Sequence, residues 1–176
     1  ALFYRICAGL AAAGANIIDA RIHTTRDGMA LDNLLVLDGR GKAYSDRKLR
    51  ARLSKSVEAA LASASPPPLP TAEAQRRSSA FEVAASVAIA ERASTRTTVV
   101  EVNARDRPAL LAALAGAIHA HGHVIHSAHI ATYGERAVDV FYLTGADGRK
   151  LVGEEIDELR SALLEASRDP AQAKAA

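Results

Sequence analysis

The sequence is poor in the residue types on which disulfide-rich and nucleic-acid-binding domains depend. It has one cysteine, Cys7, so no disulfide can form within the chain. It has no tryptophan and few other aromatic residues, and its formal net charge is only +2. Proteins that bind nucleic acids through a β-sheet need aromatic side chains beside basic ones. The composition therefore argues against a disulfide-stabilised scaffold and against a nucleic-acid partner.

Long hydrophobic runs are also missing. The alanine- and glycine-rich run from Ile6 to Ile18 is shorter than the roughly 20 residues that cross a bilayer. The first residues lack the unbroken apolar centre of a secretion signal, because Arg5 and Asp19 lie among them. We therefore expect a cytoplasmic protein that does not associate with a membrane.

The chain contains two copies of one pattern at a constant offset. Residues 2–24 match residues 110–132, and after a one-residue deletion residues 30–34 match residues 137–141. The aligned pairs include Leu2 with Leu110, Ile6 with Leu114, Gly14 with Gly122, Ile22 with Ile130, and Asp32 with Asp139. A solenoid needs three or more shorter repeats, so this pattern indicates two duplicated small domains.

The second copy shows which elements each unit contains. Residues 97–104 alternate like a half-buried strand, and a turn at 106–108 favours a helix that begins at Pro108. Gly122 ends this helix, strands at 123–133 and 136–144 follow, and Val152 begins a second helical pattern. The order strand, helix, strand, strand, helix is that of a ferredoxin-like βαββαβ unit without its fourth strand. The predicted fold class is α+β, with two ferredoxin-like domains and antiparallel sheets.

The copies divide the chain into domains. We predict a first domain at residues 1–62, a proline-rich linker at 63–79, a second domain at 80–169 and a tail at 170–176. The first copy starts within its helix, so the first domain is expected to lack its first strand and to have unpaired strand edges. Residues 81–91 alternate like a strand. They fit as the missing strand of either copy. The second copy lacks its fourth strand, which favours a hairpin between residues 81–91 and the strand that begins at residue 97.

Residue groups that could carry catalysis or bind a metal give no clear site. Five histidines lie between His119 and His129, but a helix end, Gly122 and a strand separate them, and His126 and His129 point to opposite faces. We found no nucleophile paired with a base and no closely spaced pair of carboxylates. We therefore expect neither a metal site nor a catalytic centre within this chain.

The turn at residues 103–111 is the best candidate for ligand binding. A helix N-terminus presents unpaired N–H groups and a partial positive charge, which suit a carboxylate. Asp106 beside it could accept an ammonium group, so the turn fits a zwitterionic amino acid. The alternative is that Asp106 only caps the helix and that Arg105 and Arg107 are solvated.

Three segments resemble a known family. Residues 98–108 (TVVEVNARDRP) and 127–143 (SAHIATYGERAVDVFYL) closely resemble the second ACT domain at the C-terminus of bifunctional PII uridylyltransferase/uridylyl-removing enzymes. Residues 17–32 (IIDARIHTTRDGMALD) resemble the first such domain, and the resemblance covers nearly the whole chain. One departure is Ala109, where the family usually has glycine. Its methyl group could narrow access to the helix N-terminus.

The resemblance implies a regulatory function. Enzymes of this family attach UMP to the PII signal protein when glutamine is scarce and remove it when glutamine is abundant. The chain would be the sensor, with no cofactor and no activity of its own, and L-glutamine would be its effector. The nucleotidyltransferase and HD domains would lie upstream in the same chain, with PII as a partner and Mg²⁺ expected for the parent enzyme. The alternative is a structural pair of domains that docks the catalytic core or PII without a small molecule.

The resemblance also places L-glutamine at the turn, with its carboxylate on the amides of residues 109–111 and its ammonium near Asp106. The far side of the pocket is expected from residues 18–22, or from the equivalent strand of another molecule. The candidate ligand-binding residues are Asn103, Asp106, Arg107, Pro108, Ala109, Leu110, Leu111, Asp19, Arg21, Ser127 and His129. Asp32 and Asp139 are predicted to be buried and paired, because their neighbours on the same strand face are apolar.

Overall fold

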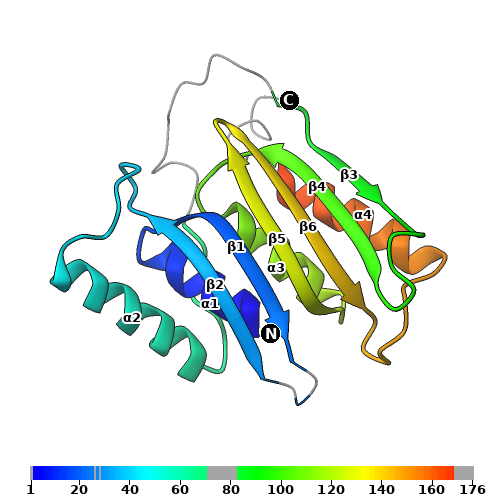
Figure 1. Ribbon diagram of the computed structural model, residues 1–176, viewed down its shortest axis with the longest axis horizontal. Helices are drawn as coiled ribbons and strands as arrows, with labels where there is room; N and C mark the ends of the chain where they lie inside the picture. Colours follow the sequence, from blue (N-terminus) through cyan, green and yellow to red (C-terminus); the bar gives the residue numbers. More distant parts are fainter. Residues whose placement is uncertain (1, 26, 28, 71–82, 169–176) are drawn as a thin grey trace.

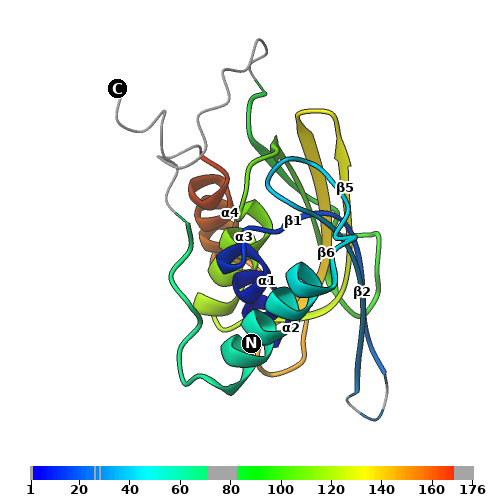
Figure 2. The same ribbon diagram turned by 90° about the vertical axis from the view of Figure 1, so that its left-hand side faces the viewer.

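The computed structural model describes residues 2–25, 27, 29–70 and 83–168. The elements, in chain order, are α1 (Leu2–Ala12), β1 (Asn16–Thr24), β2 (Ala30–Leu37), α2 (Arg47–Ala62), β3 (Ser86–Ile89), β4 (Thr98–Arg105), α3 (Leu110–Ala120), β5 (Val124–Tyr133), β6 (Arg136–Thr144) and α4 (Glu154–Ser167). The strands form one antiparallel sheet in the order β2-β1-β5-β6-β4-β3. All four of these helices lie on one face of the sheet (Figure 1, Figure 2). The α+β class is confirmed, and the two predicted sheets join into one.

The two copies meet where β1 pairs with β5. Ala20 lies opposite Ile130, Arg21 opposite His129, and Ile22 opposite Ala128. Residues 20 and 22 are the sequence counterparts of 128 and 130, so this register is the one that an internal twofold axis requires. Both strands also carry a bulge at equivalent positions, after Ile17 and after Ile125. The first unit (α1, β1, β2, α2) and the second unit (β3 to α4) are therefore related by the duplication.

Strand β3 completes the second unit. Val87 lies opposite Val102 and Ile89 opposite Val100 in an antiparallel ladder with β4. Of the two alternatives for residues 81–91, the hairpin with the second copy is thus the observed one, although residues 81 and 82 lie outside the described part. No described strand pairs with the outer edge of β2, apart from an isolated bridge between Leu37 and Ala43.

The core lies between the helices and the inner face of the sheet. Its largest fully buried side chains include Phe141, Leu143, Leu114, Ile118, Leu159 and Leu163. Small residues let the helices approach closely: a Cβ atom built on Gly9 would lie 3.0 Å from the Cβ of Ala60. The Ser56 hydroxyl donates a hydrogen bond to the carbonyl of Gly9 at 2.8 Å. Alanine and glycine thus set the short distance between α1 and α2.

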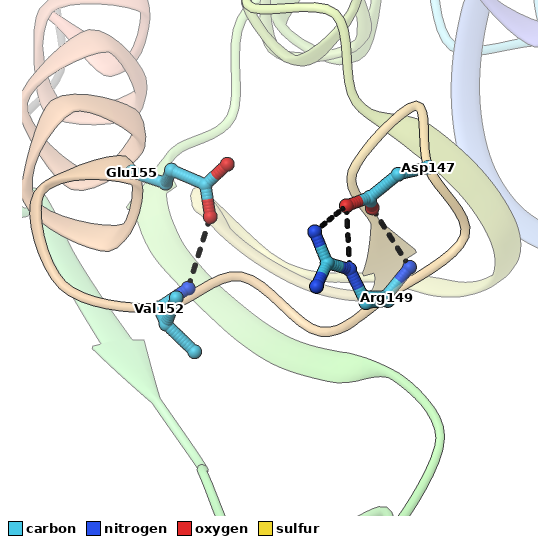
Figure 3. Close-up of polar contacts among 4 residues, drawn as sticks. All are labelled: Asp147, Arg149, Val152 and Glu155. Atoms are coloured by element: carbon cyan, nitrogen blue, oxygen red, sulfur yellow. Dashed lines mark hydrogen bonds and ion pairs between the residues drawn. The ribbon is translucent and has the colours of Figure 1, made fainter.

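Local polar contacts hold the loop from β6 into α4 (Figure 3). The Asp147 carboxylate accepts bonds from the Arg149 amide at 3.0 Å and from its Nε at 2.7 Å. The Val152 amide donates to the Glu155 carboxylate at 3.1 Å, just before the first turn of α4. The prediction that Val152 opens the apolar helix face is wrong, because the helix begins at Glu154 and Val152 is 69% exposed. Its buried face instead includes Leu159 and Leu163.

Two further predictions need correction. Helix α3 begins at Leu110 rather than Pro108, because Ala109 has a left-handed backbone (φ 61°, ψ 8°) that a right-handed helix cannot include. The segment 63–79 is not wholly a free linker, since Leu69 packs against the core and Arg5 donates hydrogen bonds to the carbonyl of Ser63 at 2.9 Å and to that of Leu61. Residues 71–79 of the segment, and the predicted tail at 170–176, lie outside the described residues.

Candidate functional site

The Asp106 turn faces the first unit across a small cavity. The cavity has a volume of about 20 Å³, room for about one water molecule. On the second unit it is lined by Asp106, Arg107, Ala109, Leu110, Leu111 and Ala112, with Ile130, Thr132, Ala137 and Asp139 from the sheet. On the first unit it is lined by Cys7, Ala11, Ala15, Asn16 and Ile17. The cavity therefore lies between the two units, and each unit supplies one wall.

The N-terminus of α3 points its amide groups at this region. The Leu110 amide donates to the carbonyl of Arg107 at 3.1 Å, and the Ala113 amide donates to that of Ala109 at 2.9 Å. Within the described residues no backbone acceptor is recorded for the two amides between them, those of Leu111 and Ala112. Ala109 precedes the helix without a side-chain cap. The helix start thus offers free donors and partial positive charge to an anion.

Ala109 stores backbone strain at this site. It is the one non-glycine residue with a positive φ among the described residues. A left-handed backbone costs an alanine about 1–2 kcal/mol relative to its ordinary conformations. Strain of this kind concentrates at functional sites, where the surrounding structure maintains it. The conformation also explains why a glycine would be favoured at this position.

Asp106 links the two units. The Asn16 side-chain amide donates a hydrogen bond to the Asp106 carboxylate, with 3.4 Å between Nδ2 and Oδ2. The Asp106 backbone amide donates to the carbonyl of Glu135 at 2.7 Å, which fixes the turn on the sheet. Burial raises the pKa of Asp106, while the bonds from Asn16 and from the Arg107 amide act in the opposite direction. The carboxylate is therefore partly desolvated, and the positive charge of Arg107 offsets part of this effect.

Asp139 supplies a second carboxyl group to the cavity. It lies on β6 opposite Val102 and Ile130 and is only 2% exposed. Among the described residues its Oδ1 atom has no hydrogen-bond partner, and none of their ion pairs includes it. Burial, and next the negative charge of Asp106, raise the pKa of Asp139 to about 7. The prediction that Asp139 is buried is confirmed, and the prediction that it is paired is wrong.

Its counterpart Asp32 has a similar but more open environment. Asp32 is half-buried, its Oδ1 atom lacks a partner within the described part of the chain, and burial raises its pKa. The prediction that Asp32 is fully buried and paired is therefore wrong as well. The Cys7 thiol is fully buried, and burial, reinforced by both aspartates, raises its pKa well above the ordinary value. A thiol of this kind is unreactive.

Five predicted ligand-binding residues lie elsewhere. Asp19, Arg21, Ser127 and His129 alternate with the core residues of β1 and β5, so they face the side of the sheet opposite the helices. Asn103 lies on that same side, where it accepts hydrogen bonds from Arg136 and donates one to Glu101. The structure brings some of these residues together, with Arg21 opposite His129, but keeps them away from the cavity. Pro108 belongs to the turn without lining the cavity.

The histidines are dispersed in the structure. His121 and His123 stack at 6.3 Å, His119 lies against Tyr4, and His126 bonds to the Thr144 hydroxyl at 2.9 Å. No three His, Cys, Asp or Glu side chains among the described residues are placed to hold a metal ion.

A larger cavity occupies the equivalent place in the first unit. It has a volume of about 430 Å³ and is lined by counterparts of the first cavity's residues, including Leu2, Phe3, Ile22, Asp32, Val124 and Ile125. Strand β4 pairs with β6 next to Asp139, and no described strand of the first unit pairs with β2 in the same way next to Asp32. The smaller cavity lies beside the acidic Asp106 turn that precedes its helix, and this makes it a candidate site for an amino acid.

The alternation of β1 contained the information that Asp19 and Arg21 face away from the site. Ala20 and Ile22 are apolar and occupy the core face, which places Asp19 and Arg21 on the other face. The bulge after Ile17 then shifts the alternation, so that Ile17 again points inward. Asn16 was missed because it reaches Asp106 only through the contact between the two units.

None of the described helices is long and apolar enough to span a membrane. No protein-family model matches the chain. No solved structure matches it either.

Curated relatives were found by sequence comparison. The chain is 45% identical over 98% of its length to the bifunctional uridylyltransferase/uridylyl-removing enzyme of Erythrobacter litoralis, and 47% identical over 96% to that of Novosphingobium aromaticivorans. It is 47% identical over 86% of its length to the enzyme of the same name from Zymomonas mobilis. It spans 19%, 19% and 17% of these relatives. Over nearly its whole length the chain is therefore homologous to about a fifth of a bifunctional uridylyltransferase/uridylyl-removing enzyme.

Proposed function

We propose that the chain is the glutamine-sensing regulatory region of such an enzyme, built from two ACT domains. L-Glutamine would bind in the cavity between the units and shift the balance between uridylylation and deuridylylation of PII. The parent's nucleotidyltransferase and HD domains, and the Mg²⁺ expected for them, would lie outside this chain. Its described residues offer no acidic cluster for that metal. The homology and the lack of a membrane-spanning helix in the described part support a cytoplasmic location.

One observation carries the proposal: the free amides of α3 and the Asp106 carboxylate flank one cavity. The Leu111 and Ala112 amides suit the ligand carboxylate, and Asp106 suits its ammonium. Two separated groups of opposite sign select a zwitterion over a simple anion or cation. The second acidic group, Asp139, disfavours a ligand with an extra negative charge, which favours glutamine over glutamate.

The size of the cavity connects binding to movement. Space for about one water cannot hold an amino acid, so the ligand must widen the gap between the units. Its ammonium would replace the amide of Asn16 on Asp106 and so break the hydrogen bond between the units. At a glutamine concentration tenfold above the dissociation constant, the available bias is about 1.4 kcal/mol. That is enough to shift a balanced equilibrium about tenfold.

Calorimetric titration of the whole chain with L-glutamine and L-glutamate tests the proposal. Asp106→Ala should weaken glutamine binding by about 1.5–3 kcal/mol, roughly 10- to 150-fold, because a charge-assisted hydrogen bond is lost. Asp19→Ala is the matched control, since Asp19 is an exposed aspartate on the opposite face of the sheet. Equal effects of the two substitutions, or no binding heat with glutamine, would refute the assignment.

The second candidate is a docking module without a small-molecule ligand. The uncovered sheet face favours it, because Leu31 and Leu35 on β2 are 60% and 56% exposed there. Binding of PII or of the catalytic domains, abolished by Leu31→Ser with Leu35→Ser while glutamine gives no heat, would support this alternative instead.

A further inference from the structure

We propose that Asp139 exchanges a proton with solvent when the ligand binds: it holds a proton in the empty site and releases it as the ligand's ammonium group enters between Asp106 and Asp139. This inference rests on the proposed function and adds a pH dependence to it. The proton goes from the Asp139 carboxyl group to bulk water, and the resulting carboxylate pairs with the ammonium.

The placement of Asp139 is the first reason. The residue lines the cavity together with Asp106, yet it is only 2% exposed and its Oδ1 atom has no partner among the described residues. Buried carboxyl groups are ordinarily hydrogen-bonded or paired with a cation. The Asp139 carboxyl group faces the cavity without such a partner, so it is available to bind a cationic group of a ligand.

None of the ion pairs within the described part of the chain gives Asp139 a counter-charge. On the sheet its neighbours are Val102 and Ile130, both apolar. The α1 helix contributes the neutral Cys7 thiol. The α3 helix contributes Leu110 and Leu111, and the turn contributes the negative Asp106. Arg107 uses its Nη2 atom to donate to the carbonyl of Ala166 at the end of α4, at 2.7 Å.

These surroundings set the direction of the coupling. Burial and the charge of Asp106 raise the pKa of Asp139 to about 7, so near neutral pH the empty site holds about half a proton at this residue. A bound ammonium stabilises the ionised form and lowers that pKa. Since only the ionised form pairs with the ligand, apparent affinity should be about tenfold weaker at pH 6 than at pH 8.

The internal repeat supplies a matched control. Asp32 occupies the equivalent position in the first unit, also with an Oδ1 atom that lacks a partner among the described residues, but it lines the larger cavity and not the one beside Asp106. Substitution of Asp32 removes a similar carboxyl group without touching the proposed ligand site.

The experiment is calorimetric titration of the whole chain with L-glutamine at pH 6, 7 and 8, in two buffers with different ionisation enthalpies. For the wild-type chain and Asp32→Asn we expect release of about half a proton per ligand at pH 7 and more at pH 6. Asp139→Asn should bind glutamine with the same heat in both buffers. Its affinity at pH 6 should equal its affinity at pH 8. Thermal unfolding of each variant checks that it is folded.

A carbon-13 NMR titration of the Asp139 carboxyl group gives a second measurement. Its midpoint should lie near pH 7 in the free chain and fall by more than one unit with saturating glutamine. Glutamine binding with unchanged proton release in Asp139→Asn, or an unshifted midpoint, would overturn this inference and leave the proposed function standing. No glutamine binding at any pH would overturn both.

Discussion

The unpaired carboxyl group of Asp139 should make the stability of the fold depend on pH. Its pKa is about 7 in the folded chain, against 3.8 for an unperturbed aspartate, because it is buried without a partner. A raised pKa means that the folded state holds the proton more tightly than the unfolded state. The contribution of Asp139 to stability is therefore greatest below pH 4, falls as the pH rises towards 7, and levels off above that.

The magnitude follows from the size of the shift. One pKa unit corresponds to 1.36 kcal/mol, so the whole effect is about 4 kcal/mol, of which about 2 kcal/mol falls between pH 5 and pH 7. Asp139→Asn keeps the shape and removes the ionisation. We expect Asp139→Asn to be more stable than the wild type at pH 7. The difference between their free energies of unfolding should increase by about 2 kcal/mol from pH 5 to pH 7.

Urea denaturation of both proteins at pH 5, 6, 7 and 8 measures this gap. Asp19→Asn is the control, because Asp19 is an exposed aspartate on the opposite face of the sheet. Parallel pH profiles for the wild type and Asp139→Asn would refute the reasoning, because they would mean that Asp139 has a counter-charge or access to water in the folded chain.

Two other changes test the local geometry and the pairing of the first unit. Ala109→Gly should stabilise the chain by about 1 kcal/mol in the same assay, since glycine adopts the left-handed backbone without strain. The variant should bind glutamine equally well or more tightly. Lower stability would show that the methyl group makes a useful contact. In hydrogen exchange the centre of β1, around Ile22, should be protected as strongly as the centre of β6, because β1 pairs with both β2 and β5. Rapid exchange of the β1 amides would contradict the joined sheet.

Much of the fold could be predicted from the sequence because the duplication shows each element twice. Strand β6 was predicted with its observed ends, and the hairpin of residues 81–91 with β4 was the favoured alternative. The pairing of β1 with β5 was not predicted, because contacts between two units leave no periodic signal in either. The sequence therefore suggested a weakly paired first unit, whereas β1 is held from both sides.

The sequence predicted the Asp106 turn on the second unit and residues 18–22 on the first, whereas the first unit lines the cavity with other residues, including Asn16 and Ile17. A strand, an acidic residue and proline before a helix form a local pattern, so the Asp106 turn could be recognised from neighbouring residues. Asn16 reaches Asp106 only through the tertiary arrangement, and the left-handed backbone of Ala109 opposes the ordinary preference of alanine. The missing partner of Asp139 was unpredictable for a similar reason, because an apolar strand face predicts burial without showing what lies above it.

The pairing pattern also shows where the two units can separate. The ladder between β1 and β5 covers only residues 19–23, and Asn16 and Ile17 pair with β2 alone. The bulge after Ile17 separates these two residues from the ladder. A ligand that widens the cavity can thus displace this end of β1, with α1 beside it, without breaking the β1–β5 hydrogen bonds. The joined sheet keeps the units in register and leaves the end that contacts Asp106 free to respond to the proposed ligand.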